Sequence, residues 1–402
     1  MTRIRRTASG RLTKVAAAAA LAAVAGLAGA LAFGPASARP VARNAATATP
    51  PTWRRQAPPE PAGTTDQAFG AVSCSSSSAC LAIATHDIFE HGYGQYAETW
   101  NGSHWSLRAV PKAADVYLYG VQCRGAQWCV AVGAIGDGPV ADRWNGSAWK
   151  QAKPPVPAGA TTSSLTAVAC TGTTACMAIG ESERGGGPPS LLTERWNGSA
   201  WKIEPVPAPP VGHGVLTAVA CPAADACRAV GNDKGGLFSE VWNGSSWLIR
   251  PVPVPAGGSD AELEAVSCAA AGSCEAVGTY STSKGRTFRP LAEAWNGSRW
   301  LAQAPPVVSG TTSGGLEAVS CVSTADCEAA GPNGTMAGVP QAGVLEKWNG
   351  MTWSVQEKVL PAGDKWATLS GISCTTGPVC EAVGSYGPPT DSTHLLALRY
   401  SS

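Results

Sequence analysis

Short apolar runs, separated by polar and proline-rich turns, fill most of the chain. Residues 165–209 show the pattern: one run of small and β-branched residues ends at Cys170, a second ends at Gly180, and two more lie around Trp196 and Trp201. Runs of this length and composition are typical of β-strands bounded by turns. The pattern therefore predicts a unit of four short strands.

The unit recurs at intervals of about 50 residues, and repeats of that length are typical of propellers, solenoids and arrays. Each unit carries two cysteines with five residues between them, and six units then show the phrase Trp-Asn-Gly-x-x-Trp. Asn-Gly between two apolar runs predicts a hairpin turn. The cysteine pairs are Cys74 with Cys80, Cys123 with Cys129, Cys170 with Cys176, Cys221 with Cys227, Cys268 with Cys274, Cys321 with Cys327, and Cys374 with Cys380.

The two ends of the chain carry complementary parts of one unit. The seventh unit stops after Tyr400, where the other units have their first Trp, and it lacks a fourth strand. The missing strand is present near the N-terminus, because Trp53 precedes Cys74 by 21 residues, the interval that separates Trp149 from Cys170. A solenoid is open at both ends, so it does not require one unit to be divided between the two ends of the chain. We therefore predict an all-β, seven-bladed propeller of four-stranded antiparallel blades, closed by the N-terminal strand.

The strand ending in glycine, the aromatic residue, the polar turn and the following Trp together resemble the Kelch propeller repeat. They are also similar to the Trp-Asn-Gly-x-x-Trp repeats of secreted actinobacterial proteins. The resemblance covers about residues 52–402. This chain has a single glycine where Kelch repeats have a pair, and it adds two cysteines to each blade. The resemblance implies the propeller fold and leaves the activity open, because propellers host many functions.

The first 38 residues read as a secretory signal peptide. Five basic residues come first, Val15–Phe33 is apolar, and Ala36-Ser37-Ala38 has the small residues of a cleavage site. An uncleaved membrane anchor is the alternative. We therefore expect a signal peptide over 1–38, a flexible linker over 39–51, and the propeller over 52–402 in a protein secreted outside the cell.

The even cysteine count and fixed spacing decide between metal ligands and disulfides. Each pair supplies only two thiolates, and no histidine recurs with them. In an exported chain such pairs predict one disulfide within each blade.

Charge argues against a nucleic-acid partner. Without residues 1–38 the chain keeps 24 Lys and Arg against 28 Asp and Glu, and no basic stripe remains to follow a phosphate backbone. We expect a monomer that does not stay inserted in a membrane once its signal is cleaved.

Variation between blades points to the functional end of the propeller. The cysteine and tryptophan hairpins have fixed lengths, whereas the connection from the second cysteine to the first aromatic residue varies from 15 to 21 residues. In a propeller the variable connections share one end of the ring, which we call the variable face, and the fixed hairpins share the other, the disulfide face. Length variation is typical of binding loops, so we place the site on the variable face.

One position near the start of each innermost strand varies around the ring. Its residues are Gly70, Tyr119, Thr166, Thr217, Glu264, Glu317 and Ser370. Glu264 and Glu317 fall in adjacent blades, where paired carboxylates could bind Ca²⁺ or act as acid and base on a glycoside. A solvated channel lining is the alternative, and no other cofactor is indicated.

Two further stretches are unique to one blade. His86 and His91 lie in the first blade's loop and could contribute to a metal site or a sugar platform, or the loop could be an ordinary exposed one. Trp366 lies outside the tryptophan pattern, in a variable connection, where an exposed ring could stack on a sugar or a partner.

An acidic residue stands two positions before the first Trp of six blades, and we expect it to make a structural hydrogen bond. These residues are Glu98, Asp142, Glu194, Glu240, Glu293 and Glu346.

The sequence as a whole favours a secreted binding module for a glycan or a protein. A surface scaffold and a glycan-active hydrolase or lyase are the alternatives, and no catalytic motif stands out.

Overall fold

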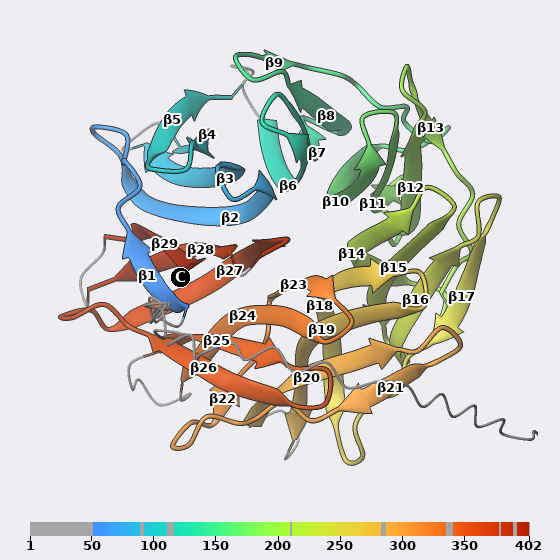
Figure 1. The fold of residues 1–402 in the computed structure, drawn as a ribbon. Helices are drawn as coiled ribbons and strands as arrows, with labels where there is room; N and C mark the ends of the chain where they lie inside the picture. Colours follow the sequence, from blue (N-terminus) through green and yellow to red (C-terminus); the bar gives the residue numbers. More distant parts are fainter. Residues whose placement is uncertain are drawn as a thin grey trace, which may run out of the picture. The chain divides into compact units, whose positions relative to one another are not determined.

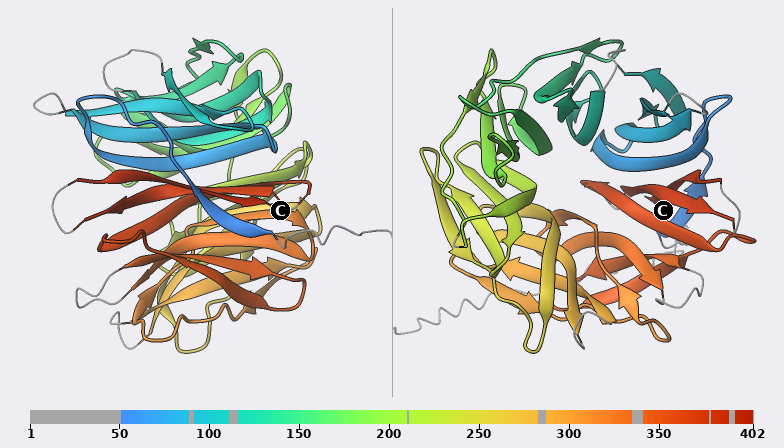
Figure 2. Two further views of the ribbon diagram at one scale, coloured as in Figure 1. Left: turned by 60° about the vertical axis from the view of Figure 1, so that its left-hand side comes forward. Right: turned by 180° about the vertical axis from the view of Figure 1, so that it is seen from behind.

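The computed structural model describes residues 51–88, 92–110, 116–209, 211–282, 287–334, 341–377, 379–388 and 392–401. Within these ranges every named element is a β-strand, and the strands form seven antiparallel sheets around a central axis (Figures 1 and 2). The predicted signal peptide and the linker up to residue 50 lie outside the described residues. None of the described residues belongs to a helix that is long and apolar enough to cross a membrane.

Each sheet is one blade, and in blades one to six the strands run in chain order from the axis outward, whereas blade seven has β27, β28 and β29 followed by β1. The innermost strands are β2 (Thr65–Ser76), β6 (Val116–Gly125), β10 (Thr162–Gly172), β14 (Gly214–Ala223), β18 (Ser259–Ala270), β22 and β23 (Ser313–Gly314 and Ala318–Ser323) and β27 (Trp366–Thr375). The second strands are β3 (Ala79–Ile88), β7 (Trp128–Ile135), β11 (Ala175–Glu183), β15 (Ala226–Asp233), β19 (Ser273–Thr282), β24 (Asp326–Gly334) and β28 (Val379–Gly387).

The outer half of each blade is a second hairpin. The third strands are β4 (Gly92–Trp100), β8 (Gly138–Trp144), β12 (Ser190–Trp196), β16 (Gly236–Trp242), β20 (Thr287–Trp295), β25 (Ala342–Trp348) and β29 (His394–Ser401). The outermost strands are β5 (Trp105–Ala109), β9 (Trp149–Lys150), β13 (Trp201–Ile203), β17 (Trp247–Pro251), β21 (Trp300–Gln303), β26 (Trp353–Val359) and β1 (Thr52–Gln56). We number the blades one to seven from β2–β5 to β27–β29 with β1.

The N-terminal strand closes the ring, as predicted. β1 pairs antiparallel with β29 over five residues, with Trp53 opposite Tyr400 and their ring centroids 5.2 Å apart. Trp53 is buried and belongs to the apolar cluster between blades six and seven, together with Leu369 and Leu398. Both ends of the described chain are therefore needed to complete blade seven.

All fourteen cysteines are paired, one disulfide in each blade, which confirms the predicted pairing. Each bond joins residues of the first and second strands, with Cα atoms 3.9 to 4.1 Å apart. Seven disulfides indicate a protein that matures in an oxidising environment.

The second cysteine of every pair is buried, and each belongs to one of the seven apolar clusters of the ring. These residues are Cys80, Cys129, Cys176, Cys227, Cys274, Cys327 and Cys380. The first cysteines lie nearer the axis, where six of them line the central cavity of the disulfide face and none of the second cysteines does. The second cysteines are therefore structural residues of the core and do not face a ligand in that cavity.

The Trp-Asn-Gly-x-x-Trp phrase is a four-residue turn between paired tryptophans. In blade two the rings of Trp144 and Trp149 lie 5.5 Å apart, and the Asn145 Oδ1 accepts the backbone N–H groups of Ser147 and Ala148. Only the glycine, Gly146, takes a positive φ, of 96°. The turn thus forms as predicted, but asparagine acts through its side chain and not through its backbone conformation.

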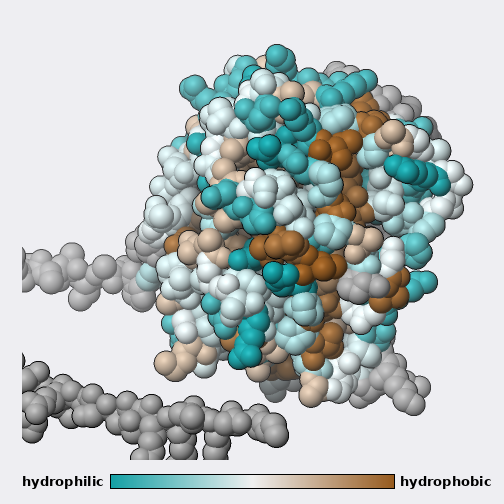
Figure 3. All heavy atoms as spheres, turned by 90° about the vertical axis from the view of Figure 1, so that its right-hand side faces the viewer, coloured by the Kyte–Doolittle hydropathy of each residue, from teal (hydrophilic) through white to brown (hydrophobic). Residues whose placement is uncertain are grey.

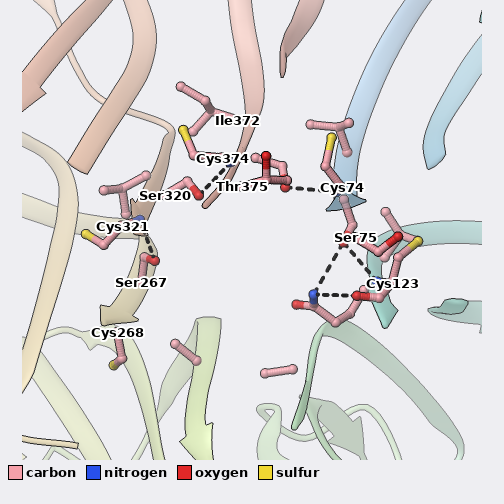
Figure 4. A pocket seen from close by; sticks show the side chains of 18 of the residues that line it. Cys74, Ser75, Cys123, Ser267, Cys268, Ser320, Cys321, Ile372, Cys374 and Thr375 are labelled. Atoms are coloured by element: carbon pink, nitrogen blue, oxygen red, sulfur yellow. Dashed lines mark hydrogen bonds between the residues drawn. The ribbon is translucent and has the colours of Figure 1, made fainter. Parts of the chain in front are cut away.

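Serine side chains fasten neighbouring blades at the disulfide face (Figure 4). The residue before the first cysteine is serine in blades one, five, six and seven, and its Oγ accepts the backbone N–H of the next blade's first cysteine at 2.8–2.9 Å. These four serines are Ser73, Ser267, Ser320 and Ser373. Four of the seven junctions therefore carry the same hydrogen bond.

A glutamate–glutamine–tryptophan contact joins blades five, six, seven and one farther from the axis. The Gln303 amide of blade five donates to Glu275 at 3.3 Å, and the Nε1 of Trp353 in blade six donates to Gln303 at 2.6 Å. The equivalent residues are Glu328, Gln356 and Trp53, then Glu381, Gln56 and Trp105. Polar contacts thus reinforce the closing junction and the two before it.

Candidate functional site

The residue that varies from blade to blade is a bulge residue. In six inner strands the pairing with the second strand skips one residue; in blade three, for example, Leu165 pairs with Gly180 and Ala167 with Ile179, so Thr166 is unpaired. The other five are Gly70, Tyr119, Thr217, Glu264 and Ser370. In blade six the strand breaks at this point, between β22 and β23, and Glu317 lies in the break. A bulge redirects the side chain of its extra residue, which explains how one position can vary while the blade persists.

The glycine of the second strand is a consequence of this bulge. A Cβ placed on Gly180 would lie 2.0 Å from the carbonyl oxygen of Ser164. β11 nevertheless continues to Glu183, so the prediction that the strand ends at Gly180 is wrong. The glycine is there because the bulged inner strand passes too close for any side chain, and not because the strand stops.

Bulge side chains lean toward the next blade. The Thr166 hydroxyl donates to the carbonyl of Leu216 in blade four at 3.2 Å, and the Thr217 hydroxyl donates to Leu263 in blade five at 2.6 Å. This direction places the bulge residue of one blade beside that of its successor. The bulge residues of successive blades are therefore the variable residues that lie close together.

Glu264 and Glu317 meet in one pocket on the variable face, between blades five and six. The pocket has a volume of about 190 Å³, and Phe288, Pro332 and Gln341 contribute to its lining. Both carboxyl groups are half-buried. The structure thus brings together the two acidic residues that the sequence placed in adjacent blades.

The charge of Glu264 perturbs the Glu317 carboxyl. Burial, followed by the negative charge of Glu264, raises the pKa of Glu317 to about 7. Burial and the nearby Glu262 also raise the pKa of Glu264. Near neutral pH the pair can therefore hold one proton, so the pocket offers both a hydrogen-bond donor and an acceptor.

Trp366 borders this pocket through Gln341. Trp366 begins β27 and forms an isolated parallel bridge with Gln341, whose own side chain is exposed. The indole is half-buried against Gly387, and a Cβ on that glycine would lie 2.8 Å from the ring. Trp366, which the sequence offered as an exposed rim tryptophan, is thus only partly exposed, because the strand begins at this residue and its ring packs on Gly387.

Tyr119 occupies the same bulge position on blade two, and its side chain is 47% exposed. Tyr117, two residues earlier, is 38% exposed, and burial together with Tyr117 and Glu181 of blade three raises the pKa of Tyr119. The pairing of tyrosines with an acidic residue makes a second polar–aromatic cluster on the variable face, away from the pocket of blades five and six.

His86 lies inside the sheet of blade one. β3 extends to Ile88, and the buried imidazole of His86 packs 5.4 Å from the ring of Tyr96. The expected loop is therefore largely a continuation of the β3–β4 hairpin. His91 lies outside the described residues. No group of three or more His, Cys, Asp or Glu in the described ranges is arranged to hold a metal ion.

A wide pocket that the sequence reasoning missed lies at the disulfide face. It has a volume of about 610 Å³ and is lined by the inner strands of all seven blades (Figure 4). Its rim is formed by the residues before the first cysteines, which the sequence shows as a column of mainly small and polar side chains: Ser73, Gln122, Ala169, Ala220, Ser267, Ser320 and Ser373. This series of small and polar residues was the sequence signal that could have indicated the cavity.

The recurring acidic residues of the third strands are buried carboxyls. Glu98, Glu194, Glu240 and Glu293 are fully buried, and neither oxygen of any of them has a hydrogen-bond partner among the described residues. Burial raises the pKa of each to about 8. The predicted structural hydrogen bond is therefore wrong for these four, which are neutral near pH 7.

The side of the ring drawn in Figure 3 does not present a continuous apolar surface. Figure 3 shows one side of the molecule, where hydrophobic residues form a broken line of small patches among hydrophilic ones. Single aliphatic side chains of the outermost strands, such as Leu248 and Leu301, are 40% and 38% exposed. Single exposed apolar residues are normal on a protein surface and do not by themselves indicate a binding site.

Solved structures share this architecture. The structure of U3-55K is 9% identical, with a TM-score of 0.54 over 87% of this chain and 98% of that one. YCF48 bound to D1 peptide is 16% identical, with a TM-score of 0.53 over 87% and 97%. The polysaccharide lyase PL25 ulvan lyase bound to -[GlcA(1-4)Rha3S]- is 8% identical, with a TM-score of 0.52 over 85% and 95%.

No protein-family model and no curated protein matches the sequence. The structural likenesses, at such low identity, establish the fold alone. The chain is thus a seven-bladed β-propeller with a disulfide in every blade and one blade divided between its ends.

Proposed function

We propose that this protein is a secreted, non-catalytic binding module that recognises a glycan in the pocket between blades five and six. The observation that carries the proposal is the convergence of Glu264 and Glu317 beside Phe288 and Gln341. Carboxyl and amide groups hydrogen-bond sugar hydroxyls, and an aromatic ring covers the apolar face of a sugar. Trp366 extends the same rim.

The protonation of the pair supports a hydroxyl-rich ligand. With the pKa of Glu317 at about 7, one carboxyl can donate a proton while the other accepts one. A sugar hydroxyl both donates and accepts hydrogen bonds, so two vicinal hydroxyls match the pair. A ligand with only one of these roles would leave a half-buried carboxyl unsatisfied.

A glycan-active enzyme is the second candidate, because the same pair has the groups of a glycosidase. Glycoside cleavage uses one carboxylic acid with a raised pKa and one carboxylate. Glu317, with its pKa near 7, would be the acid and Glu264 the carboxylate. Binding ranks first because it needs only hydrogen-bonding and stacking groups, whereas cleavage also needs the two carboxyl groups to flank a scissile bond.

Peptide and glycan ligands both occur among proteins of this fold, since the YCF48 structure holds a peptide and the ulvan lyase structure a saccharide. We favour a glycan here because the pocket ends in carboxyl and amide groups. Export through the predicted signal peptide, a Kelch-type repeat and a monomeric state belong to the same proposal. So does Ca²⁺, for which Glu264 and Glu317 are the available carboxylate donors.

A glycan-array screen with and without Ca²⁺ tests the proposal. Glu264→Gln, Glu317→Gln and Trp366→Ala should each weaken specific binding by about tenfold, since each removes one hydrogen-bonding or stacking contact. Glu357→Gln, an exposed change on β26, should leave it unchanged.

Assays for released reducing ends or unsaturated products on every glycan bound separate the two candidates. Turnover that Glu317→Gln abolishes would establish the enzyme and contradict the binding module. Failure to bind any glycan would contradict both and move the weight to a protein ligand.

A further inference from the structure

The cavity at the disulfide face has a charge that distinguishes it from the variable face. Arg124 is the one charged side chain among the described residues that line it, and no lining residue is acidic. The pocket of Glu264 and Glu317 has the opposite character. The two ends of the channel therefore attract ligands of different charge.

The Arg124 guanidinium is available to a ligand. Its side chain is exposed and takes part in none of the hydrogen bonds or ion pairs found among the described residues. Nearby protein still lowers the pKa of the guanidinium by desolvation. An exposed arginine with no ion-pair partner among the described residues binds best to an anion that offers two oxygen atoms.

Serine hydroxyls of four blades line the same cavity as this cation. The Oγ atoms of Ser73, Ser267, Ser320 and Ser373 already accept backbone N–H groups, so each hydroxyl keeps its own proton to donate (Figure 4). Thr376 adds a further hydroxyl to the lining. Such a lining favours a ligand rich in acceptor oxygens.

We propose that this cavity is a second binding site, distinct from the pocket between blades five and six, and that it takes an anionic glycan bearing a carboxylate or a sulfate. Arg124 binds the anionic group, and the serine and threonine hydroxyls bind sugar oxygens. The volume of about 610 Å³ accommodates more than one sugar ring.

The walls favour a glycan over an acidic peptide. The cavity surface open to solvent is mainly polar, and the aliphatic residues that line the cavity are each less than a tenth exposed. Those aliphatic residues are Val72, Val121, Val219, Val266, Val319 and Ile372. A peptide would find no apolar recess for its side chains, whereas a sugar meets hydroxyls wherever it turns.

Isothermal titration calorimetry on the whole protein tests this site with four probes: trigalacturonic acid, galactose 6-sulfate, uncharged maltotriose and tetraglutamate. Trigalacturonic acid or galactose 6-sulfate, or both, should bind, and more weakly at high salt; the stronger of the two identifies the anionic group. Equal binding of maltotriose, or tighter binding of tetraglutamate, would overturn the proposal.

Variants locate the site. Arg124→Gln should lower the affinity for the anionic probe by about tenfold or more, because a charge-assisted contact is lost. Thr376→Glu should weaken it by like-charge repulsion, whereas the matched Thr376→Gln should not. Arg299→Gln, an exposed arginine at the same face but off the cavity, is the control. Unchanged affinity in both Arg124→Gln and Thr376→Glu would refute the assignment.

Discussion

Replacing Glu240 by glutamine should stabilise the protein at high pH and leave its stability almost unchanged at low pH. Glu240 lies in the third strand of blade four, is fully buried, and has no hydrogen-bond partner for either oxygen among the described residues. Burial raises its pKa from 4.5 to about 8. Folding at neutral pH therefore requires the carboxyl to take up a proton.

The sign and size of the effect follow from linkage. Because the folded pKa lies above the unfolded one, the contribution of Glu240 is complete below about pH 4.5 and is lost as pH rises to about 8. At about 1.4 kcal/mol per pH unit, the loss reaches about 3 kcal/mol at pH 7 and up to about 5 kcal/mol above pH 8. Glutamine imitates the protonated carboxyl and does not titrate, so Glu240→Gln escapes this loss.

Urea unfolding followed by tryptophan fluorescence at pH 4.5, 7 and 8.5 measures the difference in free energy of unfolding. The matched control is Glu357→Gln, because Glu357 is exposed on β26. If Glu240→Gln and the wild type differ by the same free energy at all three pH values, Glu240 does not bind a proton on folding. The burial argument for all four fully buried glutamates would then be refuted.

Two further changes test the architecture. Deleting residues 52–56 should abolish cooperative unfolding, because it removes all of β1 and the buried Trp53, whose loss alone costs about 3–5 kcal/mol; Arg54→Ala, an exposed change on the same strand, should not, and an unaltered thermal transition in the deletion would contradict closure by β1. Gly180→Ala should destabilise by about 3 kcal/mol through its clash with the bulged strand, as measured by thermal unfolding, whereas Gly172→Ala, with open space around it, should be silent; equal effects would disprove the bulge explanation.

The repeated features of the fold could be predicted from the sequence, because the period of a repeat and the spacing of its residues can be measured along a single chain. The disulfides and the pairing of β1 with β29 followed from intervals between cysteine and tryptophan positions. The bulge at Glu264 was located as a variable position, but its geometry was hidden, since it depends on how β18 registers with β19.

The failures have a common physical cause: each concerns a contact between different strands. The ring of Trp366 is covered by Gly387 on the neighbouring strand, and His86 is buried beside Tyr96. The cavity at the disulfide face needs all seven inner strands at once. Composition along one strand cannot report such shared surfaces.

The split seventh blade reproduces the polar contact of the two blades before it. Gln56 stands three residues after Trp53, as Gln303 does after Trp300 and Gln356 after Trp353, while Arg108 holds that place after Trp105 in blade one. By its side chains the first strand of the chain is thus more similar to the last blades than to those that follow it. Gln56 accepts the indole N–H of Trp105 in blade one, as Gln303 and Gln356 accept those of Trp353 and Trp53. A strand contributed from the other end of the chain thus holds the neighbouring blade by the same polar contact as an ordinary outermost strand.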